Sequence, residues 1–195
     1  AQSDSDTAVS GLPVNCTIAD ILPDSLYKDI PDVFPLLDGK RMQSPFTRCL
    51  TDPDAVTIAA DSLLARFIRS PGSHDTAVIA FRDSSGLCMC EACRRLRDAR
   101  KAESAVVITW AGRVHDRVVK KKPDVRIIVS LGGIFEKPPV DMKVPDGVTV
   151  AFCPSDVDQR RPYEESIDER TMAFASNLIG WRTLNAPMLV MHPCG

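Results

Sequence analysis

The sequence has no apolar run that is long enough to cross a membrane. A membrane-spanning helix needs about 18 consecutive apolar residues, whereas segment 125–131 is short and has charged neighbours. The chain also lacks the basic start and apolar run of a signal peptide. We therefore expect no membrane partner, and we expect residues 1–12, which are small, polar and acidic, to form a disordered tail.

An excess of charge of one sign is also missing. The chain has 24 Lys and Arg residues against 26 Asp and Glu residues, which gives a formal net charge of −2. Nucleic acids and anionic lipids attract proteins through a strong positive field. The charge balance therefore argues against a nucleic-acid partner.

Nothing in the sequence divides it into domains, because internal repeats, low-complexity segments and linkers are all missing. The 195 residues are enough to bury one hydrophobic core, and 44% of them are hydrophobic. Chains that stay disordered are less apolar and more charged. We expect residues 13–195 to form a single α/β domain.

The cysteines do not form the even, regularly spaced set that is typical of a secreted disulfide-rich domain. There are seven of them, and three lie within six positions of the chain, at Cys88, Cys90 and Cys93. The other four are scattered: Cys16, Cys49, Cys153 and Cys194.

Helical spacing of apolar residues and capping signals predict four helices. The segment Thr51-Asp52-Pro53 supplies a cap, with proline at the first helical position. Ser166 and Glu169 have the spacing of a capping box. The predicted helices cover residues 53–69, 94–100, 104–118 and 166 to about 184.

Short apolar runs with no polar alternation predict strands of the buried, parallel kind. Segment 23–48 is rich in proline and turn residues, and we expect it to be mostly loop. The predicted strands cover residues 14–18, 76–81, 125–131, 147–152 and 188–191.

Alternation of helices and strands favours a mainly parallel sheet with helices packed on it. A complete eight-stranded (β/α) barrel takes about 250 residues, and this chain offers fewer strands than that fold needs. The predicted fold class is therefore α/β, parallel-stranded and barrel-like, in the form of a partial TIM barrel, with an open sheet as the alternative. An incomplete barrel leaves open strand edges. We therefore expect either self-association or an irregular closing segment over residues 19–48.

The cysteine cluster follows the predicted strand 76–81, so that three thiolates can converge on one point. Zinc prefers four ligands in a tetrahedron. Cys153 follows the strand 147–152, and the carboxyl ends of parallel strands share one rim. We therefore predict a zinc site formed by Cys88, Cys90, Cys93 and Cys153.

Three other interpretations of the cluster stay open. One is a disulfide, either Cys88–Cys93 or Cys90–Cys153, and another is a set of buried free thiols. The third is a thioredoxin-type redox pair formed by Cys90 and Cys93.

Several landmarks resemble a known family. Segment 83–93 resembles its aspartate loop followed by Cys-x-Cys-Glu-x-Cys, and segments 31–34, 38–41 and 49–53 resemble further passages of it in the same order. The resemblance covers most of residues 15–192. The family is an uncharacterised glycoside-hydrolase-like TIM-barrel family, a domain of unknown function related to α-glucuronidases and β-N-acetylhexosaminidases.

The resemblance implies a carbohydrate substrate, hydrolysis of glycosidic bonds, no organic cofactor, and a soluble protein that is secreted or periplasmic. Such hydrolysis usually needs two carboxyl groups on either side of the bond. Asp83 matches the loop aspartate of the family and is the predicted acid, with Asp156 as the second carboxyl group. The other polar residues that follow strand ends are candidate substrate ligands: Glu136, Asp158 and His192.

The chain also departs from this family, which leaves its activity open. Aromatic residues that would stack on a sugar are expected after strand 125–131, where the chain has Gly132, Gly133 and Ile134. The alternative function is a non-catalytic domain with a structural, cysteine-bound zinc site that binds a glycan or a protein. Two carboxyl groups about 5 to 10 Å apart in one pocket would favour the enzyme. A cysteine cage without such a pair would favour the alternative.

Overall fold

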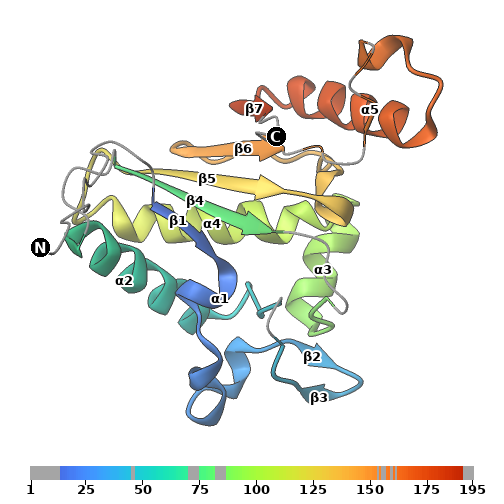
Figure 1. Ribbon diagram of the computed structural model, residues 1–195. Helices are drawn as coiled ribbons and strands as arrows, with labels where there is room; N and C mark the ends of the chain where they lie inside the picture. Colours follow the sequence, from blue (N-terminus) through green and yellow to red (C-terminus); the bar gives the residue numbers. More distant parts are fainter. Residues whose placement is uncertain are drawn as a thin grey trace, which may run out of the picture.

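The centre of the protein is a sheet of five parallel strands (Figure 1). The strands follow chain order across the sheet, as in a (β/α) barrel, and the predicted α/β parallel fold is confirmed. Within the part of the chain that the structure describes, the sheet is open. Its strands are β1 (Val14–Thr17), β4 (Thr76–Phe81), β5 (Arg126–Leu131), β6 (Val148–Phe152) and β7 (Met188–Val190).

The structure is a computed structural model. It describes residues 14–44, 47–69, 75–81, 87–152, 154, 157–158, 160 and 162–190. The predicted tail, residues 1–12, lies outside this range. Among the described residues, no helix has the length and apolar character to span a membrane.

Helices α2 (Pro53–Arg69) and α4 (Ser104–Val118) lie beside each other along the sheet (Figure 1). Alternate β4 side chains, among them Ile79 and Phe81, are buried. The ring of Phe81 packs edge-on against Trp110 of α4, with ring centroids 5.6 Å apart. This contact joins the helix layer to the carboxyl end of β4.

The last unit of the fold is α5 (Glu169–Thr183), which packs on β6. Phe174 and Trp181 of α5 both contact the ring of Phe152, with centroid distances of 6.1 and 6.0 Å. The predicted start of this helix at Ser166 is wrong. The helix begins at Glu169, because the Asp168 side chain accepts a hydrogen bond from the Thr171 N–H group and forms the N-cap.

Residues 18–44, which include most of the segment 23–48 that was predicted to be mostly loop, form a series of short elements next to β1 and α3 (Glu91–Arg100) (Figure 1). The hairpin turn contains Asp38 and Gly39, which both have positive φ angles, 46° and 78°. The elements are α1 (Ile18–Ile21), η1 (Asp24–Lys28), η2 (Pro31–Val33), β2 (Leu36–Leu37) and β3 (Lys40–Arg41).

A buried arginine holds this segment together. The Arg48 side chain donates a hydrogen bond to the Leu22 carbonyl oxygen at 2.8 Å and pairs with Asp24 at 2.8 Å. Its guanidinium group also lies 4.5 Å from the centre of the Phe34 ring. These contacts fix the chain immediately before Cys49, where the described residues form only short helices and strands.

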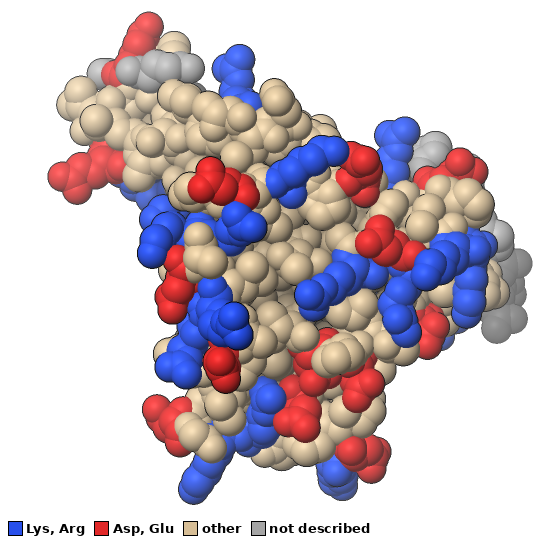
Figure 2. Space-filling model, turned by 180° about the vertical axis from the view of Figure 1, so that it is seen from behind, with Lys and Arg blue, Asp and Glu red and all other residues tan. Residues whose placement is uncertain are grey.

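The surface carries mixed charge. Basic and acidic side chains are interspersed over the face seen in Figure 2, as the net charge of −2 leads one to expect. β1 and β7 are the two edge strands of the described sheet. The predicted self-association through open edges stays a prediction.

Candidate metal centre

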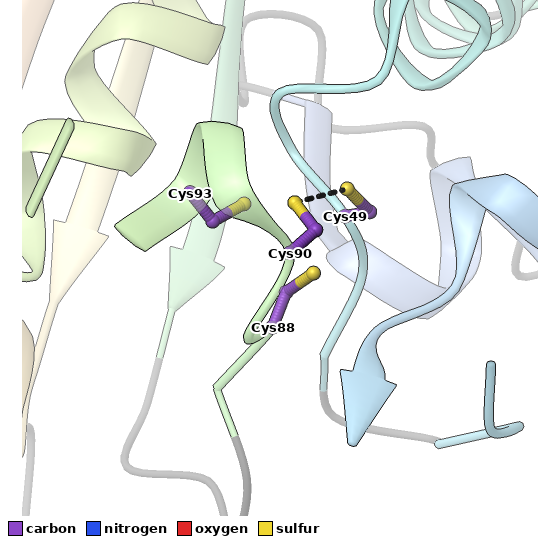
Figure 3. A group of neighbouring side chains, drawn as sticks. All are labelled: Cys49, Cys88, Cys90 and Cys93. Carbon is purple, nitrogen blue, oxygen red and sulfur yellow. Dashed lines mark hydrogen bonds between the residues drawn. The ribbon is translucent and has the colours of Figure 1, made fainter. Parts of the chain in front are cut away.

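Four cysteine thiols gather beside the sheet, at the start of α3 (Figure 3). They belong to Cys49, Cys88, Cys90 and Cys93, and their sulfur atoms all lie within 4.8 Å of one another. Two chain segments that are far apart in sequence supply them. One is the segment before α2, and the other is the segment that leads into α3.

The start of α3 places three of these thiols. Cys90 is the N-cap residue of the helix, with extended φ and ψ angles of −62° and 155°. Cys93 lies in the first turn, and Cys88 precedes the helix in a segment whose Met89 N–H group donates to the Leu36 carbonyl oxygen at 2.8 Å. That hydrogen bond docks the cysteine loop on the β2–β3 hairpin.

The fourth thiol is placed by the other segment. The Cys49 N–H group donates to the Val33 carbonyl oxygen at 2.8 Å, and the Cys49 and Cys90 sulfur atoms lie 3.6 Å apart. A tetrahedral zinc ion with Zn–S bonds of about 2.3 Å holds its sulfur ligands about 3.8 Å from one another. The observed sulfur arrangement is therefore close to that of a zinc site.

The cluster is largely removed from solvent. Cys49, Cys88 and Cys93 are 2%, 4% and 1% exposed, whereas Cys90 is partly exposed. Buried negative charge is costly unless it is paired or binds a metal. Four thiolates this close together therefore need a cation, and the residues present fit a metal ion.

Polar groups around the sulfur atoms also favour thiolates. The Leu36 N–H group donates to the Cys88 sulfur at 3.4 Å, and the Arg41 guanidinium group lies 3.9 Å from the same sulfur. The Thr51 hydroxyl group contacts the Cys93 sulfur at 3.2 Å. Groups of this kind orient the ligands of a metal and offset their charge.

The thiols share their protons unequally. Hydrogen bonds from the Cys49 and Cys93 thiols, with a further one from the Leu36 N–H group, lower the pKa of Cys88 to about 3. The pKa of Cys93 is raised by its hydrogen bonds to Cys49 and Cys88 and by burial. Deprotonation is therefore favoured at Cys88 and disfavoured at Cys93, and a bound metal would displace the protons that the thiols hold.

Cys16 provides a contrast inside the same protein. It lies on β1, and its thiol donates to the Val78 carbonyl oxygen at 3.5 Å. Burial raises the pKa of this thiol to about 11. Cys16 is therefore a protonated core residue with no part in the cluster.

The sequence predicted three of these four thiols together, and the structure brings Cys88, Cys90 and Cys93 together as expected. The described fourth member is Cys49, whereas the expected fourth ligand, Cys153, lies outside the described residues. Cys49 belongs to the connection after β1, which is the direct neighbour of β4 in the sheet. β6, which precedes Cys153, is two strands away from β4, and the predicted role of Cys153 stays a prediction.

Two of the predicted substrate ligands are described. Glu136 ends the short helix η3 (Gly133–Glu136) and is 5% exposed. Its carboxylate pairs with Arg170 at 2.7 Å, and its carbonyl oxygen accepts a hydrogen bond from the Trp181 indole N–H group at 2.7 Å. These contacts join η3 to α5.

Asp158, the other described ligand, shapes a local turn. Its N–H group donates to the Thr171 hydroxyl oxygen at 2.8 Å, and its carboxylate accepts from the Arg160 N–H group at 2.9 Å. The predicted catalytic residues Asp83 and Asp156 and the predicted ligand His192 lie outside the described residues. All of these roles stay predictions.

A small cavity adjoins the cysteine cluster. Its volume is about 30 Å³, and its wall includes Cys88, Cys93, Arg97 and Glu103. Burial raises the pKa of Glu103, whose carboxylate lies 3.1 Å from the Arg97 guanidinium group. The cavity has room for one or two water molecules but not for a sugar. Among the described residues that line it, Glu103 is the only carboxylate.

Comparison with solved structures shows a related fold. The crystal structure of β-galactosidase from Bacillus circulans sp. alkalophilus superposes on 87% of this chain with a TM-score of 0.52 and 14% sequence identity. The chain spans 33% of the length of that enzyme. At this identity the likeness shows the fold alone.

Comparison with protein sequences identifies the family. No curated protein matches the chain. A family model described as a domain of unknown function, DUF4838, matches residues 2–192. The chain, with its parallel α/β sheet and its four-cysteine cluster, is therefore a member of the DUF4838 family.

Proposed function

We propose that Cys49, Cys88, Cys90 and Cys93 bind one structural zinc ion, which fixes the irregular segment 18–50 to the start of α3. The observation that supports this proposal is the gathering of four sulfur atoms within 4.8 Å of one another. Four protein thiolates close the coordination shell. Closed sites of this kind stabilise a fold, whereas catalytic zinc keeps a position open for water or substrate.

The donor set favours zinc over other metals. Thiolates select soft or borderline ions, and a tetrahedral set of four sulfur ligands is typical of zinc or of iron in iron–sulfur centres. In a cluster with several irons, the four cysteines are divided among different iron atoms, and the inorganic core holds them apart. Four sulfur atoms that all lie within 4.8 Å of one another suit a single ion.

The position of the site explains why the fold would need a metal. The described residues of segment 18–50, which are 18–44 and 47–50, contain only short elements, and no helix among them exceeds five residues. The little apolar surface that such a segment buries does not offset the conformational entropy that the segment loses on folding. Structural zinc supplies an apparent binding free energy of about 10–16 kcal/mol in zinc-finger peptides. Zinc bound here would join this segment to α3 directly.

Charge around the site suits a bound zinc ion. A zinc ion with four thiolates carries a net charge of about −2. The Arg41 guanidinium group near Cys88 and the Leu36 N–H group offset part of this charge. Arg41 is itself held by Asp32 at 3.0 Å and by the Phe34 carbonyl oxygen at 2.7 Å. The guanidinium group is therefore already oriented toward the cluster.

Metal analysis tests this proposal. The chain, purified under reducing conditions, is expected to contain one zinc ion, and the Cys49→Ser variant is expected to contain much less. The Cys16→Ala variant is the matched control, since Cys16 is a buried cysteine away from the cluster. Equal zinc in all three proteins, or none in the parent chain, would contradict the proposal.

A second candidate function is carbohydrate binding or glycoside hydrolysis. It is supported by the likeness of the fold to a β-galactosidase and by the family resemblance. In this proposal Asp83 is the acid and Asp156 the second carboxyl group, and Glu136, Asp158 and His192 bind the sugar. Because parallel strands present their carboxyl ends on one rim, residues that follow these strands can share a pocket. The zinc site would then support the rim that carries them.

A further inference from the structure

We propose that the cysteine cluster has a second closed state, in which Cys49 and Cys90 form a disulfide in the oxidised, metal-free protein. This inference rests on the proposed zinc site and adds a form of regulation to it. Zinc and the disulfide would exclude each other, because both use the same two sulfur atoms. Oxidation would release the metal, and reduction would allow it to bind again.

This inference rests on the sulfur–sulfur contact between the segment before α2 and the segment that leads into α3. The Cys49 and Cys90 sulfur atoms lie 3.6 Å apart and are joined by the dashed line in Figure 3. A disulfide bond is about 2.05 Å long, so the sulfur atoms need to approach by about 1.5 Å. Side-chain rotation at Cys90 can supply part of this movement, because Cys90 precedes the first turn of α3.

Accessibility selects Cys90 as the residue that a reagent reaches first. It is the partly exposed member of the cluster, whereas Cys49, Cys88 and Cys93 are buried. Reaction at a cysteine requires access to its sulfur atom as well as a thiolate. We therefore expect oxidation to begin at Cys90 and to end at the thiol nearest to it across the two segments.

The other two thiols have close polar partners of their own. The Cys88 sulfur accepts a hydrogen bond from Leu36 and lies near Arg41. The Cys93 sulfur contacts the Thr51 hydroxyl group at 3.2 Å, the shortest contact that this hydroxyl makes in the cluster. These contacts favour Cys49 as the partner of Cys90.

The reaction needs an oxidant, and a small-molecule disulfide such as oxidised glutathione suffices. The Cys90 thiolate attacks one sulfur of the oxidant, which forms a mixed disulfide and releases one glutathione thiolate. The Cys49 thiol then gives its proton to solvent, attacks the Cys90 sulfur and releases the second glutathione thiolate. The two protein thiols lose two electrons and two protons, and the oxidant becomes two glutathione thiols.

Both states would make the same connection in the fold. Zinc joins the segment before α2 to the start of α3, and a Cys49–Cys90 disulfide joins them at the same two residues. The loop that it closes is long, since these cysteines are 41 positions apart. Cross-links that close long loops restrict the unfolded chain more than short ones. The proposed switch therefore exchanges one cross-link for another and keeps the segment attached.

Disulfide mapping tests the inference. The reduced, zinc-free chain is treated with oxidised glutathione, free thiols are blocked, and the linked peptides are identified by mass spectrometry without reduction. We expect the Cys49–Cys90 pair to dominate. Cys88→Ser should still form it, whereas Cys90→Ser should not. A dominant Cys88–Cys93 or Cys90–Cys93 pair, or a random mixture of pairs, would overturn the inference.

Zinc protection is the second measurement. The same reaction on the zinc-loaded chain should be slowed by about tenfold or more, because the reacting thiolates are then metal ligands. An unchanged rate in a chain that holds one zinc ion would overturn mutual exclusion. Zinc content is measured separately in the reduced chain. Absence of zinc there would refute the proposed function, while the mapped pairing would still decide the disulfide.

Discussion

The most informative perturbation is the loss of one thiol from the cluster, as in Cys49→Ser. Three cysteine thiols of the cluster remain in this variant, and the hydrogen bond from the N–H group at position 49 to Val33 is kept because it involves only the backbone. We expect the loss of zinc to remove at least about 4 kcal/mol from the free energy of unfolding, because loss of a bound metal is among the mechanisms behind the largest mutational effects. For a chain of this size, that corresponds to a fall in Tm of at least about 8 °C.

Thermal melting with and without a zinc chelator measures this effect. The chelator should lower the Tm of the parent chain to about that of Cys49→Ser and leave the variant unchanged. Cys16→Ala should have a lower Tm than the parent chain, because it truncates a buried side chain. The chelator should lower the Tm of this variant by the same amount as it lowers that of the parent chain. The zinc account would be refuted by a chelator effect of equal size in the parent chain and in Cys49→Ser.

Three further predictions follow from other contacts. Arg170→Met removes the ion pair of the buried Glu136 carboxylate. This change should lower the free energy of unfolding, measured by urea titration, by about 1–3 kcal/mol. An unchanged free energy of unfolding would show that solvent already screens the ion pair. Because the pKa of Cys93 is raised, zinc binding at neutral pH should release the proton of this thiol. The zinc affinity measured by chelator competition should therefore fall by about tenfold for each unit by which the pH drops and for each proton released. A zinc affinity that is independent of pH between 6 and 8 would contradict a protonated Cys93 in the metal-free chain. If Asp83 is the acid, Asp83→Asn should reduce the rate of aryl glycoside hydrolysis by about 100-fold or more. The control variant Asp98→Asn, which changes an exposed residue of α3, should leave this rate unchanged. Equal rates in the two variants would show that Asp83 is not the acid.

The regular part of the fold could be predicted because its signals are local. Helix α2 spans Pro53–Arg69, the range that its proline start and apolar spacing predicted. The strand Thr76–Phe81 was also predicted at both ends. The short elements over residues 18–44 were missed because distant contacts hold them, above all those of the buried Arg48 side chain. Local sequence patterns carry no signal for such contacts.

The cysteine cluster could be predicted only in part, for a reason that concerns strand order. The three thiols near α3 are close in sequence, so their proximity needs no tertiary information. Choosing the fourth required knowing that β1 and β4 are adjacent in the sheet. Thr51 shows the same difficulty, because the Asp52 carboxylate accepts hydrogen bonds at the start of α2 from the Asp54 and Ala55 N–H groups. The Thr51 hydroxyl group is left to contact the cysteines.

X-ray absorption at the zinc edge tests the central claim most directly. The reduced, zinc-loaded chain should show four sulfur neighbours at about 2.3 Å and no nitrogen or oxygen ligand. A shell that contains nitrogen or oxygen, or a sulfur count that Cys49→Ser does not change, would contradict a site made of Cys49, Cys88, Cys90 and Cys93.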